Sequence, residues 1–212
     1  MNNKEPYKLY RSIYEIIHPS ISRKNISEYK IILKDDLSSV QVFYPSKEIE
    51  LNEVLIYIHG KDIELSYYSS LAIKTKQVVI VIDYRKDKIN TLSKTVNYII
   101  NELNSDKLNI KNISIMGDFD GASIILDKLS NFSLKKVLLS PTVTDLNSYN
   151  LSNVMVISNN EKQTNINNNI IVIRDSIYDF IHNIDVISNE KIYYLIINYL
   201  NGVDLNDSKE KN

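Results

Sequence analysis

The sequence predicts an α/β fold built on a doubly wound, mostly parallel sheet of eight strands. Six short apolar runs rich in β-branched residues lie between residues 54 and 173, and such runs are typical of parallel strands with helices on both faces. Segments of helical periodicity alternate with these runs, as in doubly wound sheets. With two earlier runs included, the predicted strands are residues 29–33, 40–44, 54–58, 77–82, 113–116, 137–139, 154–157 and 170–173.

Helices are expected between the later strands and at both ends of the chain. Residues 66–74, 90–103, 120–129 and 189–200 carry apolar side chains at helical spacing. An amphipathic helix is also expected within residues 1–20, ending near His18 because Pro19 follows. Its apolar face is expected to cover the protein's own core in preference to a partner.

The length of 212 residues fits a single domain. We expect this domain to span residues 1–202 and a flexible tail to occupy residues 203–212. The connections at residues 141–153 and 158–169 are about the dozen residues that a parallel crossover needs. The sequence therefore predicts no lid domain, and a pocket that is shallow or partly open.

Charge and composition exclude several classes of function. The 25 basic and 26 acidic residues nearly cancel, so we expect no nucleic-acid or anionic-membrane partner. The chain has no cysteine, and its three histidines show no ligand spacing, so neither a metal site nor a cofactor is expected. No secretion signal or long apolar run stands out, which favours a cytoplasmic protein without a membrane span. The oligomeric state stays open.

Residues 115–124 read IMGDFDGASI and follow a predicted strand. Gly117 and Gly121 lie two positions before and two positions after Phe119. A nucleophile elbow needs small residues at these two positions, because its strand and helix approach closely while the central residue is strained. Centring the turn on Asp118 or Asp120 would lose that pattern. The spacing therefore selects Phe119 as the central residue.

Five motifs stand in order along the chain: YIHGKD at 57–62, IDYR at 82–85, GDFDGA at 117–122, LLSP at 138–141 and YDF at 178–180. With them the chain resembles the α/β-hydrolase superfamily, and within it the hormone-sensitive-lipase-like esterase branch, over residues 29–200. That branch carries HGGG, DYR, GDSAGG, SP and HGF in the same order. The resemblance implies a reduced fold of α/β-hydrolase type.

The resemblance also implies where a catalytic triad would stand. Phe119 occupies the position of the serine nucleophile, Glu161 that of the acid and Tyr178 that of the histidine. Phenylalanine has no nucleophilic atom, and a phenol with a pKa near 10 is a poor general base. The triad is therefore expected to be degenerate. The region of the oxyanion hole corresponds to His59, Gly60, Lys61 and Asp120.

Three functions remain open. The first is a pseudo-esterase that binds a small apolar ligand or a protein partner, with the Phe119 ring as an apolar plug at positive φ. The second is an active carboxylesterase or lipase-like enzyme with an unusual constellation around Asp120, Glu161 and His182. The third is a structural or regulatory subunit that uses its tyrosine-rich first helix. Ser123 and His182 are candidate substitutes for the missing groups, although a packing serine and a surface histidine are the simpler interpretations.

Overall fold

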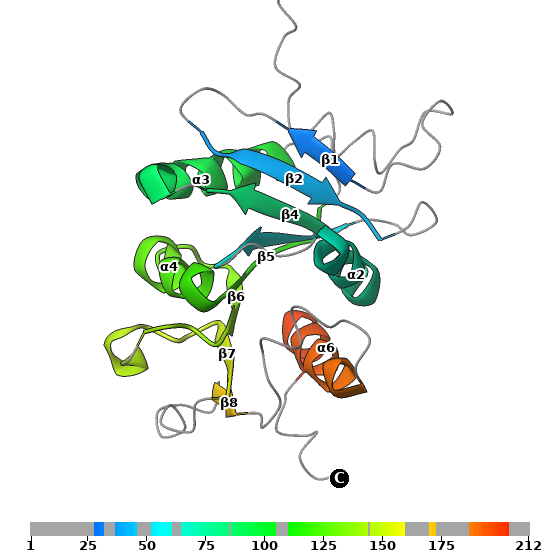
Figure 1. Cartoon of the computed structure of the whole chain (residues 1–212), viewed down its shortest axis with the longest axis vertical. Helices are drawn as coiled ribbons and strands as arrows, with labels where there is room; N and C mark the ends of the chain where they lie inside the picture. Colours follow the sequence, from blue (N-terminus) through cyan, green and yellow to red (C-terminus); the bar gives the residue numbers. More distant parts are fainter. Residues whose placement is uncertain are drawn as a thin grey trace, which may run out of the picture. The chain divides into compact units, whose positions relative to one another are not determined.

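The computed structural model describes residues 28–31, 37–45, 52–60, 65–84, 86–104, 110–143, 145–159, 170–172 and 187–203. The described residues form eight strands and four α-helices, so the fold is α/β (Figure 1). The chain divides into two compact units, Met1–His59 with Tyr68–Ile113, and Gly60–Tyr67 with Ser114–Asn212. The helix expected within residues 1–20 and residues 204–212 of the expected tail lie outside the described residues.

Four strands of the first unit form a mixed sheet. Their order is β1-β2-β4-β3, with β1 and β4 antiparallel to β2 and with β3 parallel to β4. Val42 and Ile56 both pair with Ile80 of β4, and all three side chains are fully buried. The bounds are β1 (Glu28–Ile31), β2 (Ser39–Phe43), β3 (Glu53–Ile58) and β4 (Val78–Asp83).

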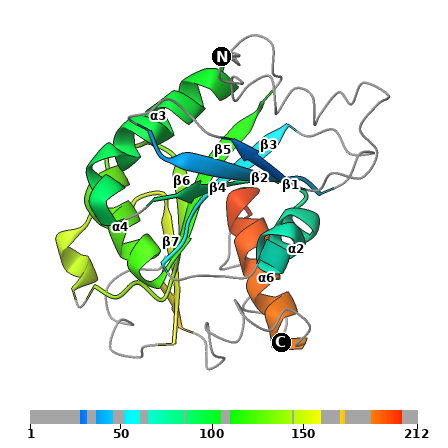
Figure 2. The same ribbon diagram turned by 45° about the horizontal axis from the view of Figure 1, so that its top comes forward.

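Helices α2 (Leu65–Thr75) and α3 (Leu92–Leu103) lie on opposite sides of the strands β2 and β4 (Figure 2). Tyr68 of α2 packs against Phe43 and Tyr57, with ring centroids 5.4 and 5.2 Å apart. The prediction that an α-helix begins at residue 90 is wrong by two residues. A 3₁₀ helix, Lys86–Thr91, precedes α3, as often happens at helix N-termini.

Four parallel strands of the second unit follow the order β5-β6-β7-β8. Asp118 pairs with Leu139, and Leu139 with Ile157, so the carboxyl ends of three strands meet at one edge. The bounds are β5 (Asn112–Asp118), β6 (Lys135–Leu139), β7 (Val154–Ser158), β8 (Ile170–Val172), α4 (Phe119–Leu129), a 3₁₀ turn (Leu146–Ser148) and α6 (Ile187–Leu200).

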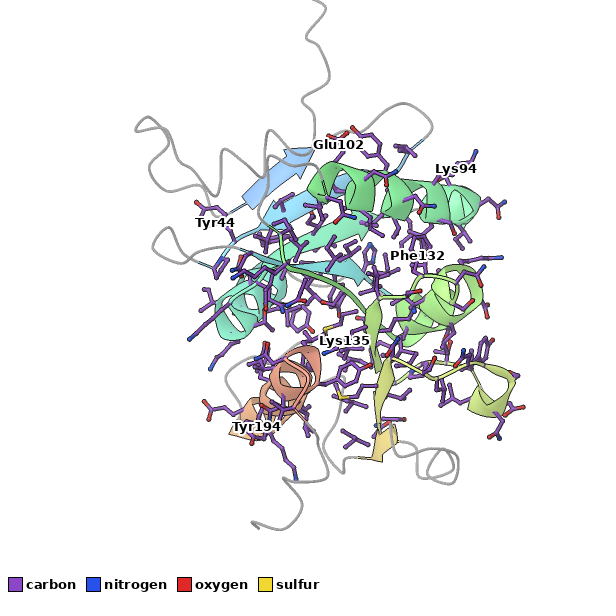
Figure 3. All side chains as sticks on the ribbon, turned by 180° about the vertical axis from the view of Figure 1, so that it is seen from behind. Tyr44, Lys94, Glu102, Phe132, Lys135 and Tyr194 are labelled. Carbon is purple, nitrogen blue, oxygen red and sulfur yellow. The ribbon has the colours of Figure 1, made fainter. Side chains whose placement is uncertain are left out.

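Two consecutive lysines of β6 bond to backbone on opposite faces of the strand. Lys135 Nζ donates hydrogen bonds to the carbonyls of Tyr199 (3.0 Å) and Leu200 (2.8 Å), at the end of α6. Lys136 Nζ donates to the carbonyls of Phe132 and Leu134, in the turn after α4, and burial lowers its pKa. Lys135 is labelled in Figure 3, and α4 and α6 flank β6 from opposite sides in Figures 1 and 2.

Helix α6 carries neighbouring tyrosines in contrasting environments. Tyr193 is 3 % exposed, whereas Tyr194 is 55 % exposed (labelled in Figure 3). Burial raises the pKa of Tyr193 to about 12. Among the described residues, no helix has both the length and the apolar character required to cross a membrane.

The buried phenol of Tyr193 predicts a loss of stability at alkaline pH. Its pKa of about 12 in the folded protein lies above the ordinary value of 10.0, so its contribution is present below pH 10 and is lost as the pH rises toward 12. Tyr193→Phe should flatten this fall in the free energy of unfolding by up to about 2 to 3 kcal/mol, because one pKa unit corresponds to about 1.4 kcal/mol. Urea unfolding at a series of pH values measures the slope.

The matched control is Tyr194→Phe, which removes an exposed phenol from the next position of the same helix. Comparing the two variants separates the effect of the buried phenol from that of a Tyr→Phe change as such. An unchanged slope in Tyr193→Phe would contradict the assignment.

Candidate functional site

The strand β5 turns into α4 without an intervening loop. Asp118 ends the strand in an extended conformation, with φ −122° and ψ 151°, and Phe119 begins the helix. Phe119 has φ 41°, in the left-handed region, where the Cβ atom of an L residue is crowded by the backbone. Gly117 and Gly121 on either side are buried. The backbone therefore forms the sharp turn that the glycine spacing predicts, with an aromatic residue at its centre.

Gly60 lies against this turn within the second unit. Its N–H group donates a hydrogen bond to Oδ1 of Asp118, whose side chain is fully buried. A Cβ atom added to Gly60 would lie 2.3 Å from the carbonyl oxygen of Asp118 and 2.8 Å from the amide nitrogen of Asp120. No side chain fits at position 60, so the contact requires glycine.

His59, the preceding residue, is held within the first unit. Its carbonyl oxygen accepts a hydrogen bond of 2.6 Å from the Tyr84 hydroxyl, and the two rings lie 5.4 Å apart. The tyrosine of the IDYR motif thus braces the end of β3 through backbone and ring. Sequence reasoning assigned Tyr84 no such contact, although its place directly after β4, the parallel neighbour of β3, was a usable signal.

A hydroxyl network connects the first turn of α4 with the segment after β6. The Thr142 hydroxyl donates to Oδ1 of Asp120 (2.9 Å), and the Thr142 N–H donates to the Ser123 hydroxyl (2.9 Å). Ser123 Oγ lies 2.9 Å from Thr142 Oγ1 and 3.1 Å from the Phe119 carbonyl oxygen. Asp120 and Thr142 are exposed, and Ser123 is half-buried.

Ser123 therefore uses its hydroxyl group within the scaffold. Its oxygen accepts the Thr142 N–H, and its proton can go to a backbone carbonyl of the preceding turn, a common arrangement for serine inside a helix. The Asp120 carboxylate reaches Ser123 only through Thr142 Oγ1. A serine nucleophile needs a general base in direct contact with its hydroxyl group. These contacts therefore fit a packing role better than a nucleophile.

Several predicted site residues lie outside the described residues: Lys61, Glu161, Tyr178 and His182. Their assigned roles stay predictions. The described part of the chain has no group of three or more His, Cys, Asp or Glu side chains that could hold a metal ion. What the described residues bring together is a half-buried aromatic ring at an elbow, a glycine contact and a network of hydroxyl groups.

The contact at Gly60 predicts a large effect of adding one methyl group. Gly60→Ala would place a Cβ atom 2.3 Å from a backbone oxygen, so backbone must move, and we expect a loss of stability in the upper part of the range of about 1 to 3 kcal/mol typical of overpacking. Urea or thermal unfolding measures the loss.

Gly202 provides the control, because it also resists substitution but for another reason. It has φ 78°, and the nearest atom to an added Cβ is the end of a lysine side chain at 3.4 Å. Gly202→Ala should cost about 1 kcal/mol, from backbone strain alone. A smaller loss of stability at position 60 than at position 202 would contradict the prediction. It would mean that the backbone of the turn moves at little cost.

Comparisons with known proteins give structural matches only. No model of a protein family matches the chain, and no curated protein matches it. An esterase from the fungus Rhizomucor miehei is 20% identical with a TM-score of 0.43, over 54% of this chain and 43% of that chain. The carboxylesterase EstE1 from a metagenomic library is 18% identical with a TM-score of 0.44, over 64% and 54%. A bacterial esterase of the hormone-sensitive lipase family is 18% identical with a TM-score of 0.43, over 62% and 49%. The chain spans about half the length of these structures.

Proposed function

We propose that this protein is a pseudo-esterase: a reduced domain of α/β-hydrolase type that has lost ester hydrolysis and acts by binding a small apolar ligand. The observation that carries the proposal is Phe119 at φ 41°, at the centre of an elbow whose purpose in a hydrolase is to present a nucleophile. We also propose that residues 1–202 form one domain. This domain would contain a single, mostly parallel sheet of eight strands, no lid and a shallow or partly open pocket.

The strained backbone of Phe119 supports a role for the direction in which its side chain points. A residue held at such a φ costs about 1 to 3 kcal/mol and persists only where its surroundings determine it. In this protein the strained residue carries no nucleophilic atom. The side chain is instead a half-buried ring, and aromatic rings are among the strongest apolar contacts that a protein offers. A ring at the former acyl site suits an apolar ligand.

The charge next to the elbow also disfavours ester hydrolysis. Acyl transfer needs hydrogen-bond donors where negative charge develops on the substrate oxygen. The residue after the central position, whose N–H group is one such donor in the family, is Asp120, which carries an exposed carboxylate. An active esterase with an unusual constellation, and a subunit that binds a protein partner, are the alternatives that the following experiments separate.

The proposal predicts that the protein lacks esterase activity. Purified protein should hydrolyse p-nitrophenyl acetate and butyrate no faster than buffer, and a fluorophosphonate probe should leave it unlabelled, because losing a serine nucleophile lowers the rate on the order of 10⁶-fold. Saturable turnover that persists through rigorous purification would overturn the proposal in favour of the active esterase.

A variant that restores the nucleophile tests the assignment of the base. Phe119→Ser should gain no robust turnover, because Tyr178 at the histidine position supplies no base at neutral pH. The matched control is Phe132→Ser, which adds the same hydroxyl group at another half-buried phenylalanine of the second unit. Strong turnover in Phe119→Ser alone would mean that another group acts as the base.

The proposal also predicts that the Phe119 ring contributes to stability. Phe119→Ala should lower the free energy of unfolding by about 1 kcal/mol or more, because part of the ring is buried. Phe119→Gly should be no less stable than Phe119→Ala, since glycine adopts positive φ without strain. Chemical denaturation of both variants measures the difference.

The same pair of substitutions at Phe132 provides the control, because that residue is half-buried and lies outside the left-handed region. There the glycine variant should be the less stable of the two. A neutral Phe119→Ala would contradict the buried plug and favour an exposed aromatic contact for a protein partner.

A further inference from the structure

The geometry points to a conformational device beside the elbow. We propose that Asp120, Ser123 and Thr142 form a hydroxyl latch that holds Phe119 at its positive φ and thereby sets the direction of its ring. The latch would act in this way whether or not the domain hydrolyses esters. Ser123 and Thr142 are therefore positioning residues, which act through the backbone of Phe119.

The latch contacts the strained residue directly. The Phe119 carbonyl group lies 3.1 Å from Ser123 Oγ, so the peptide that follows the strained φ angle is fixed by a side chain one turn further along α4. Thr142 then fixes Ser123, through its N–H group and through its hydroxyl oxygen, each at 2.9 Å. A residue after β6 thus fixes the first turn of α4 in place.

The hydrogens of the latch can be assigned from its geometry. Each hydroxyl group has one proton to donate, and Thr142 gives its proton to Oδ1 of Asp120. Ser123 then shares its proton between Thr142 Oγ1 and the Phe119 carbonyl oxygen. The threonine donates to the carboxylate, and the serine proton is divided between the threonine oxygen, which continues this chain, and the Phe119 carbonyl oxygen, which fixes the turn.

The opposite side of the turn is fixed independently. Asp118, the residue before Phe119, accepts the Gly60 N–H group through its buried carboxylate. Phe119 is therefore held between a side-chain contact on its N-terminal neighbour and the latch on its own carbonyl group. Strained residues persist where such surroundings over-determine them. If the latch were opened, the Phe119 carbonyl group would lose its side-chain hydrogen bond and keep only the backbone bond of the helix, so the carbonyl side of Phe119 would be less constrained.

A tryptophan at position 119 makes the latch observable, because the chain contains no other tryptophan. In the Phe119→Trp protein, with excitation at the red edge of tryptophan absorption where the fifteen tyrosines do not absorb, emission wavelength, anisotropy and acrylamide quenching report on this side chain alone. Adding Ser123→Ala or Thr142→Val should lower the anisotropy, raise the quenching constant and shift the emission maximum. Unchanged values in both double variants would overturn the proposal.

Matched controls separate the latch from a general loss of structure. Thr142→Ser keeps the hydroxyl group and should behave as the parent, as should Ser130→Ala, which removes an exposed serine at the C-terminal end of the same helix. Asp120→Asn keeps an acceptor oxygen, whereas Asp120→Ala removes it, so only the alanine variant should move the signal. If Ser123→Ala does not fold, Thr142→Val and Asp120→Ala decide the question, because each changes an exposed side chain.

A double-mutant cycle tests the strain itself. In the wild-type background, Ser123→Ala removes hydrogen bonds but also lets the backbone of Phe119 relax. The strain that is released then offsets part of the stabilising free energy that is lost. In the Phe119→Gly background there is no strain to release. Ser123→Ala should therefore lower the urea midpoint more in the glycine background than in the wild type. Equal shifts in both backgrounds would mean that the strain is held elsewhere, and would refute the latch.

Discussion

The elbow depends on the close approach of Gly60 to Asp118. A buried carboxylate without a hydrogen-bond donor is costly, and the Gly60 N–H group supplies a donor to Asp118. The approach leaves no space for a Cβ atom at position 60. Because β5 runs into α4 without a loop, fixing Asp118 also fixes where the helix begins. This backbone contact shapes the turn without reference to the central side chain, and so a phenylalanine can occupy its centre.

The parts of the structure that were predictable from the sequence are local. Short β-branched runs marked the strands of each unit because a strand buried on both faces needs apolar residues at every position. The turn at Phe119 was predictable because two glycines four positions apart meet a steric requirement within one segment. The partnership of Thr142 with Ser123 could not be derived in this way. It arises because β5 and β6 are parallel neighbours, so the residues after one strand meet the helix that follows the other.

The beginning of β6 shows another limit of sequence patterns. The predicted strand began at residue 137, where the apolar run begins, whereas lysines are rarely buried. The structure starts the strand at Lys135, and Lys136 is only 3 % exposed. The Lys135 ammonium group donates to backbone carbonyls at the end of α6. The Lys136 ammonium group donates to backbone carbonyls in the turn after α4. These acceptor carbonyls lie in a helix distant in sequence and in an irregular turn. A pattern of apolar and polar residues does not indicate their positions.

Stability and acyl transfer make opposite demands on the first turn of α4. A carboxylate there is favoured by the helix dipole, and Asp120 gains a further hydrogen bond from Thr142. The same negative charge lies one residue after the elbow centre, where a hydrolase must stabilise a developing oxyanion. If the proposed latch holds Phe119, its carboxylate would therefore hinder ester hydrolysis even if a serine replaced the phenylalanine. A rigid elbow with a carboxylate beside its centre would fit the binding role proposed above.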